Sequence, residues 1–136
     1  MKLRFLLDTH ILIHWLVDPR RLSPEQKRCL GEASSREEDL AISAATLLEL
    51  AILFSSGRAR YIKTDLSKLI ASLEDFPQLQ ILPITVEVAS EMIALGGTAN
   101  WDPGDRTIVA TARVNGLSLL TSDQRIIESR LVPVIG

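Results

Sequence analysis

Cysteine is almost missing from the sequence, because Cys29 is the only one among the 136 residues. A single cysteine excludes an internal disulfide and a zinc site built from several thiolates. It also favours a reducing compartment, so we expect a cytoplasmic protein. Long apolar runs are missing as well. The run at residues 3–7 ends at Asp8, too short for a signal peptide or a membrane span, so no membrane partner is expected.

The residues that are present suit one folded domain over residues 1–136. Apolar residues make up 46% of the chain, which is ample for a core, and charged residues make up 24%. The net charge of −2 does not by itself favour nucleic acid as a partner. If five of the 17 acids share a metal pocket, however, 15 basic and 12 acidic residues remain, a balance of +3. Net charge therefore does not exclude a nucleic acid.

Short apolar runs alternate with helical patterns along the whole chain. We expect strands at residues 3–7, 40–42, 79–82, 117–120 and 131–135, with the last at a sheet edge because it contains Pro133. Helices are expected at residues 11–17, 24–34, 44–54, 64–76, 85–95, 105–115 and 124–129. This alternation predicts an α/β fold in which helices cover both faces of a parallel sheet of about five short strands. Ligands bind such sheets at the edge where the carboxyl ends of the strands meet.

Acidic residues stand where these elements meet. Asp8 follows the first strand and Asp123 follows the fourth, so both belong at the carboxyl edge. Asp102 and Asp105 flank the start of a helix. Each of the four also has a simpler interpretation, because an aspartate at a helix start can act as an N-cap or interact favourably with the helix dipole. Taken singly, these acids leave both interpretations open.

Glu49 is harder to explain as a structural residue. Its helix, residues 44–54, is apolar around nearly its whole circumference, so we expect that helix to be buried. A carboxylate there is unfavourable unless it is paired or bound to a metal ion. A salt bridge to a buried arginine is the alternative explanation.

The combination of acids points to a metal site. Carboxylates at Asp8, Glu49, Asp105 and Asp123 would repel one another in one crevice and raise each other's pKa. Divalent cations relieve that repulsion, and all-oxygen sites favour Mg²⁺ or Mn²⁺, which can activate water and align a phosphodiester. Zinc is less well supported, because His10 and the histidine four residues later have no third soft ligand nearby.

Four short motifs follow one another along the chain: Leu6-Leu7-Asp8-Thr9-His10, Ser43 with Glu49, Asp102-Pro103-Gly104-Asp105-Arg106 leading into residues 108–112, and Thr121-Ser122-Asp123. In this order and spacing they resemble the PIN-domain family, and within it the VapC-like toxins of toxin–antitoxin pairs. The resemblance covers essentially the whole chain. Family members often have an aromatic or other apolar residue in place of Gly104, and this departure puts the shape of the substrate pocket in doubt rather than the chemistry.

The resemblance implies an α/β/α fold and an endoribonuclease that depends on Mg²⁺ or Mn²⁺. Its catalytic and metal-binding acids would be Asp8, Glu49, Asp105 and Asp123, and Asp102 matches an acid found in one branch of these toxins. RNA would be the substrate, and a cognate antitoxin and a second copy of the chain would be the protein partners.

Other polar residues are expected to support the site. The hydroxyl groups of Thr9, Ser43 and Thr121 could hydrogen-bond the carboxylates or the phosphate. Arg106, which belongs to the matched signature, is expected among these supporting residues. A basic stretch further along could bind the RNA backbone, although a solvated surface is the alternative; its residues are Arg58, Arg60 and Lys63.

Two rival functions remain. A phosphotransferase of the haloacid-dehalogenase type also has an aspartate after the first strand, but it places a second acid where this chain has His10. The rival from another class is a catalytically silent RNA-binding or scaffold module on the same fold. Inactive relatives are expected to lose acids, whereas this chain keeps all four.

Overall fold

The sheet is described by a computed structural model that covers residues 3–36, 39–55, 66–74, 76 and 78–136. Within these ranges the strands are β1 (Leu3–Leu7), β2 (Asp39–Ser43), β3 (Leu79–Leu82), β4 (Ser118–Leu120) and β5 (Val134–Ile135). They form one sheet in the order β3-β2-β1-β4-β5, and every pairing is parallel. The predicted parallel sheet of five short strands is confirmed, and β5 lies at its edge as Pro133 indicated.

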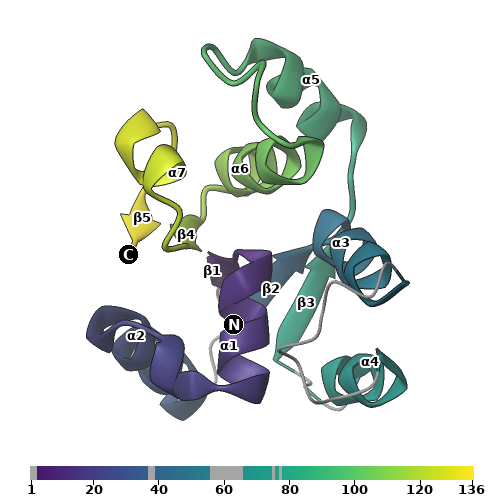
Figure 1. The fold of residues 1–136 in the computed structure, drawn as a ribbon. Coiled ribbons are helices and arrows are strands. Elements are labelled where there is room, and N and C mark those ends of the chain that lie inside the picture. Colours follow the sequence, from purple (N-terminus) through teal and green to yellow (C-terminus); the bar gives the residue numbers. More distant parts are fainter. Residues whose placement is uncertain (1–2, 37–38, 56–65, 75, 77) are drawn as a thin grey trace.

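Helices cover both faces of this sheet (Figure 1). They are α1 (Thr9–Val17), the 3-10 turn η1 (Pro19–Arg21), α2 (Pro24–Ser35), α3 (Ala44–Ser55), α4 (Leu66–Glu74), α5 (Val86–Ala94), α6 (Pro103–Asn115) and α7 (Gln124–Ser129). Helices α5 and α6 lie on one side of the sheet, and α1, α2 and α4 lie on the other. The three-layer α/β/α architecture is therefore confirmed.

The strands bury alternate residues in two separate cores. Phe5 and Leu7 of β1 join the cluster formed with α1, α2, α3 and α4, whereas Leu6 joins the cluster formed with α5, α6 and α7. The same alternation places Leu120 in the first cluster and Leu119 in the second. Burial of both faces explains why these strands read as continuous apolar runs rather than as alternating ones.

Several helix ends follow directly from local sequence. Ser23 and Gln26 form the predicted capping box at the start of α2, with each side chain bonded to the other's backbone N–H. Thr85 caps α5, and Gly116 ends α6 in the left-handed conformation that glycine adopts without strain.

Other boundaries differ from the prediction. Helix α6 begins at Pro103 rather than Asp105, because Asp102 occupies the N-cap position and proline suits the first turn. Strand β5 is only two residues long, not five. The expected start of α4, residues 64–65, lies outside the described residues. No helix of the described ranges is long and apolar enough to cross a membrane.

The strand order creates a crevice beside β1. Strands β2 and β3 lie on one side of β1, whereas β4 and β5 lie on the other, so the chain first moves away from β1 in one direction and then crosses back to its other side. In an open parallel sheet this reversal leaves a crevice at the carboxyl ends of the strands. The end of β1 leads to Asp8, whose backbone N–H donates to the Leu120 carbonyl of β4 at 3.0 Å.

Candidate active site

Asp8 lies at the base of this crevice and is 6% exposed. One carboxylate oxygen accepts the Thr9 N–H at 2.8 Å, and the other accepts the Thr121 hydroxyl at 2.7 Å. Burial raises the pKa of this carboxyl, although these two hydrogen bonds oppose the rise. Thr121, directly after β4, also accepts the Asp123 N–H at 3.1 Å. Thr121 thereby links the end of β1, which leads to Asp8, with the segment after β4 that contains Asp123.

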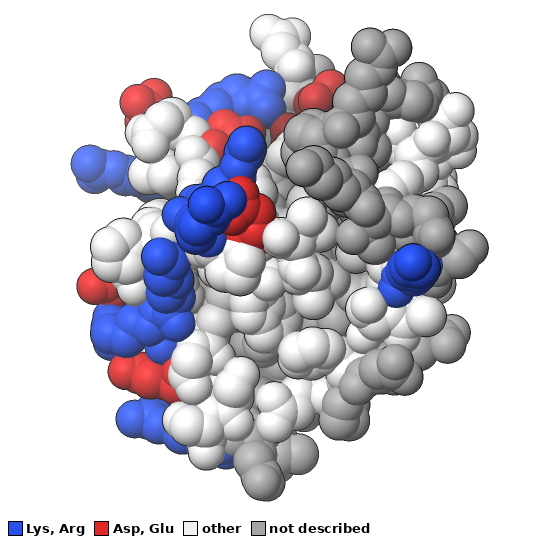
Figure 2. Space-filling model, turned by 60° about the horizontal axis from the view of Figure 1, so that its bottom comes forward, with Lys and Arg blue, Asp and Glu red and all other residues white. Residues whose placement is uncertain are grey.

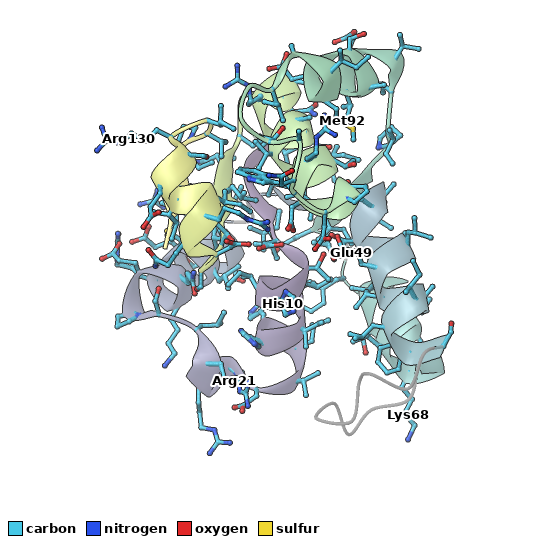
Figure 3. All side chains as sticks on the ribbon, turned by 45° about the horizontal axis from the view of Figure 1, so that its top comes forward. His10, Arg21, Glu49, Lys68, Met92 and Arg130 are labelled. Atoms are coloured by element: carbon cyan, nitrogen blue, oxygen red, sulfur yellow. The ribbon has the colours of Figure 1, made fainter. Side chains whose placement is uncertain are left out.

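Glu49 projects from α3 towards the middle of the molecule, above His10 of α1 (Figure 3). Its Oε1 atom is buried and has no hydrogen-bond partner among the described residues. Burial, followed by the negative charges of Asp105 and Asp8, raises its pKa to about 7. A buried oxygen without a partner is unfavourable in itself. No buried arginine pairs with Glu49 within the described part of the chain, so the salt-bridge alternative is not supported there.

Helix α3 is less buried than predicted. Leu48 is 62% exposed and Ile52 is 48% exposed, whereas Leu50 is fully buried. The expectation of a helix buried around its whole circumference was therefore wrong. The apolar pattern reflected both a core face and an uncovered apolar face, which sequence periodicity does not separate.

Asp105 lies in the first turn of α6 and faces the same crevice. Burial raises its pKa to about 6, the charges of Asp8 and Asp123 add to the rise, and the guanidinium of Arg125 opposes it. Asp102 occupies the N-cap position of the same helix, yet among the described residues its side chain makes no capping hydrogen bond. Asp102 therefore stands at the N-cap position that the sequence allows, but its carboxylate does not cap the helix.

Gly104 lets Glu49 approach the start of α6. A Cβ atom at position 104 would lie only 2.8 Å from Glu49 Cδ, and it would meet Glu49 Oε1 at still shorter range. Any larger residue would force the Glu49 carboxylate to move. The departure from the family pattern noted at this position therefore sets the place of an acid as well as the shape of the pocket.

Asp123 completes the group as the N-cap residue of α7. Its Oδ1 accepts the backbone N–H of Arg125 at 2.9 Å. The capping role foreseen for this aspartate and its position at the crevice are thus both present. The same is true of Asp8, which precedes α1 and accepts from its first N–H.

All the candidate acids line one cleft of about 380 Å³, whose walls are Asp8, His10, Glu49, Asp102, Asp105, Ser122, Asp123 and Arg125. A second groove of about 360 Å³ shares three of these residues, and it is lined by Thr9, His10, Ile13, Glu49, Ile52, Leu53, Asp102 and Gly104. Carboxylates distant in sequence therefore meet at one place. Within the described ranges, no three His, Cys, Asp or Glu side chains are already arranged to hold a metal ion.

Two of the predicted supporting residues, Thr9 and Thr121, act on acids of the cleft, whereas Ser43 caps a helix. Thr121 contacts Asp8 as described, and the Thr9 hydroxyl, 3.0 Å from that of Thr46, lowers the pKa of Glu49. Ser43 instead accepts the Ala45 N–H at 3.0 Å as the cap of α3.

Another predicted supporting residue, Arg106, does not line the cleft. Arg106 donates to the Met92 carbonyl at 2.8 Å and so links α6 to α5. The predicted RNA contacts, Arg58, Arg60 and Lys63, lie outside the described residues.

Several cations elsewhere among the described residues pair with neighbouring acids. Figure 2 shows Lys and Arg along one side of the face that carries α2, with an uncharged area beside them. Arg20 and Arg21 pair with Asp18 at 2.9 and 3.6 Å, and Arg28 pairs with acids of its own helix. Exposed pairs of this kind contribute little to stability.

Arg125 was missed by the sequence reasoning. Its Nη2 atom donates to Asp105 Oδ2 at 2.8 Å and lies 3.5 Å from Asp123 Oδ2. The only signal in the sequence is a basic residue two positions after Asp123, which is a common arrangement in a first helical turn.

Comparison with known proteins identifies the fold family. The sequence model of the PIN domain matches residues 5–130. The chain belongs to the PIN domain family. This PIN domain is 34% identical over 121 residues to Ribonuclease VapC22 of Mycobacterium tuberculosis, covering 89% of this chain and 88% of that protein. The expected family and its VapC-like branch are thereby confirmed.

Solved structures agree with this assignment. The PIN domain resembles the VapBC2 complex of Rickettsia felis with a TM-score of 0.70 at 14% identity, over 98% of both chains. It resembles VapBC of Salmonella typhimurium with a TM-score of 0.69 at 22% identity, again over 98% of both chains. Both of those structures contain DNA. At these identities the likeness establishes the fold.

Proposed function

We propose that this PIN domain is a Mg²⁺- or Mn²⁺-dependent endoribonuclease that acts as the toxin of a toxin–antitoxin pair. The observation that carries the proposal is the meeting of four acids from separate parts of the chain at one cleft, namely Asp8, Glu49, Asp105 and Asp123. The chain that carries them is related to a protein named as a ribonuclease.

The donor set fits a hard divalent cation. Every candidate ligand is a carboxylate, and Glu49 Oε1 is buried without a partner among the described residues. Burial raises the pKa of Asp8, Glu49 and Asp105, and the negative charges of neighbouring acids add to the rise, so a bound cation would favour the ionised carboxylates. Asp8, Asp105 and Asp123 would hold the ion, with Glu49 as a ligand directly or through water. When bound, such an ion would supply an activated water for attack on phosphorus and a positive charge for the leaving oxygen.

The protein's own residues hold these acids in place. Thr121 orients Asp8 by donating to one carboxylate oxygen, which leaves the other to accept from the Thr9 backbone. Gly104 leaves space for Glu49 against α6. Such hydrogen-bonded support of ligands typically changes metal affinity or activity by about 10- to 100-fold when it is removed.

Cleavage of total RNA by the purified chain tests this function. We expect cleavage with Mg²⁺ or Mn²⁺, none with EDTA, and none for Asp8→Asn with either metal. Asp18→Asn is the matched control, because Asp18 pairs with Arg20 and does not line the cleft. Cleavage that resists the chelator, or full activity of Asp8→Asn, would contradict the proposal. RNA binding without cleavage in the presence of Mn²⁺ would favour the catalytically silent module instead.

An antitoxin partner is part of the proposal. The solved structures named above are VapBC assemblies, one of them described with its promoter DNA. The groove beside the acid cleft offers apolar contacts from Ile13, Ile52 and Leu53, which suit a segment of a partner protein. Co-expression with the product of a small neighbouring reading frame should give a complex that copurifies and does not cleave RNA. An unbound and active chain under these conditions would contradict this part of the proposal.

A homodimer is also proposed, and exposed apolar residues on α5 support it. Val86 is 84% exposed and Ile93 is 85% exposed, and their spacing of seven residues places them on the same face of the helix. Sedimentation should show a dimer for the wild type and a monomer for Ile93→Glu. A monomeric wild type would exclude the dimer without affecting the proposed catalysis.

A further inference from the structure

Arg125 is a positive charge placed among the acids. It belongs to the first turn of α7, and its Nη2 atom contacts one oxygen of Asp105 and one of Asp123. Among the described residues that line the acid cleft, it is the one lysine or arginine. Its side chain is 44% exposed, whereas that of Asp105 is 18% exposed. The guanidinium therefore lies between the acids and the solvent.

The aromatic ring of Trp101 contacts this guanidinium. The Cζ atom of Arg125 lies 5.2 Å from the centre of the Trp101 ring, in the range of a cation–π interaction. Trp101 is 8% exposed and belongs to the core beneath α6 and α7. The contact with the ring does not depend on either carboxylate. The arginine can consequently change its hydrogen-bond partners while it keeps its position at the edge of the cleft.

The contacts of Arg125 conflict with the proposed metal site. Arg125 contacts one carboxylate oxygen of Asp105 and one of Asp123, two acids that would hold the ion, and a divalent cation beside them would repel the guanidinium. Metal binding would therefore weaken the contacts of the two acids with Arg125. A phosphodiester entering the same cleft brings a new anion, and the planar fork of arginine suits phosphate oxygens well.

From this geometry we propose that Arg125 is a phosphate-binding residue that competes with the metal ion for Asp105 and Asp123 and exchanges these carboxylates for the RNA backbone. This role rests on the proposed ribonuclease function and adds Arg125, a residue that the sequence analysis did not single out, to the site. It requires effects of opposite sign: loss of Arg125 strengthens metal binding and weakens RNA binding. Loss of a merely structural arginine, which held the two acids in position, would weaken both.

Two measurements on the purified chain test this exchange. The first is the Kd for Mn²⁺ from calorimetry without RNA, and the second is the RNA concentration that gives half-maximal cleavage in saturating Mn²⁺. For Arg125→Gln we expect the Kd for Mn²⁺ to fall roughly fivefold, in line with the loss of one partly exposed pair. We expect the half-saturating RNA concentration to rise by a similar factor, roughly fivefold, with the maximal rate within about twofold.

Two further variants separate charge from shape. Arg125→Lys keeps the charge and should recover part of the RNA affinity. Arg113→Gln is the matched control, because Arg113 also pairs with a surface carboxylate, Glu91, at 2.5 Å but lies outside the cleft. It should change neither measurement. Unfolding followed by circular dichroism confirms that each variant is folded.

The outcomes are distinguishable. Weaker Mn²⁺ binding by Arg125→Gln would overturn the exchange and indicate a structural role. Values equal to those of Arg113→Gln would overturn it as well, while the wild-type activity leaves the proposed function standing. A wild type that neither binds Mn²⁺ nor cleaves RNA would refute the proposed function, and the role of Arg125 with it.

Discussion

A Glu49→Gln substitution removes one charge from the acid cleft and keeps the shape of the side chain. In the folded protein the pKa of Glu49 is raised to about 7, by burial first and then by the charges of Asp105 and Asp8. In the unfolded chain the same group has an ordinary pKa near 4.5. Between these two values the folded state keeps a proton that the unfolded state has lost. The free energy of unfolding of the wild type therefore falls as the pH rises through this window.

The size of the effect follows from the shift. The difference between these two pKa values corresponds to roughly 3.5 kcal/mol, at about 1.4 kcal/mol for each pKa unit. Because the Glu49 side chain is partly exposed, solvent screening reduces this, and we expect about 1–2 kcal/mol of destabilisation at pH 8. Glu49→Gln should remove this penalty. For a domain of 136 residues it should raise Tm by roughly 4–7 °C.

Thermal unfolding in EDTA at pH 8 and pH 5 measures this difference. We expect the variant to be more stable than the wild type at pH 8 and nearly equal to it at pH 5, where Glu49 of the folded wild type is protonated. Glu128→Gln on the exposed surface of α7 is the control for loss of a charge alone. Added Mn²⁺ should stabilise the wild type and have much less effect on Glu49→Gln. A variant that is equal to or less stable than the wild type at pH 8 would refute the electrostatic reasoning.

Three other substitutions follow from contacts in the structure. Gly104→Ala should leave Tm unchanged or slightly higher, because alanine favours a helix by up to about 1 kcal/mol, yet it should weaken Mn²⁺ binding in calorimetry by displacing Glu49. Thr121→Val should lower the free energy of unfolding in urea by about 1–2 kcal/mol and raise the pKa of Asp8 further, which carbon-detected NMR would show. Arg106→Gln should destabilise the fold by about 1–3 kcal/mol in urea by releasing α5, with the rate of RNA cleavage per folded molecule unchanged.

Much of the fold could be read from the sequence because its signals are local. An apolar run that ends in Asp8 indicates a strand followed by a turn, whatever its tertiary contacts are. Ser23 and Gln26 form a capping box because they are only three positions apart. The convergence of Asp8 and Asp123 was predictable for the same reason, since parallel strands present their carboxyl ends at one edge.

Other features depend on which side chains of separate elements meet, and spacing along the chain does not specify that. The sequence predicted a buried α3, but only packing decides that Leu50 enters the core while Leu48 does not. It contained an aspartate and a glycine in α6, but the approach of Glu49 to Gly104 exists only once α3 lies beside that helix.

Arg106 and Arg125 show the same division most clearly. The first belongs to the matched motif yet donates to a carbonyl of α5, and the second belongs to no motif yet contacts two acids of the cleft. Residue order alone determined the order of strands and helices, the capping box of α2 and the acids at the strand ends, because each depends on neighbours in the chain. Tertiary packing decided which charges are paired and which oxygen remains without a partner, because long side chains reach across elements whose separation is set by the core.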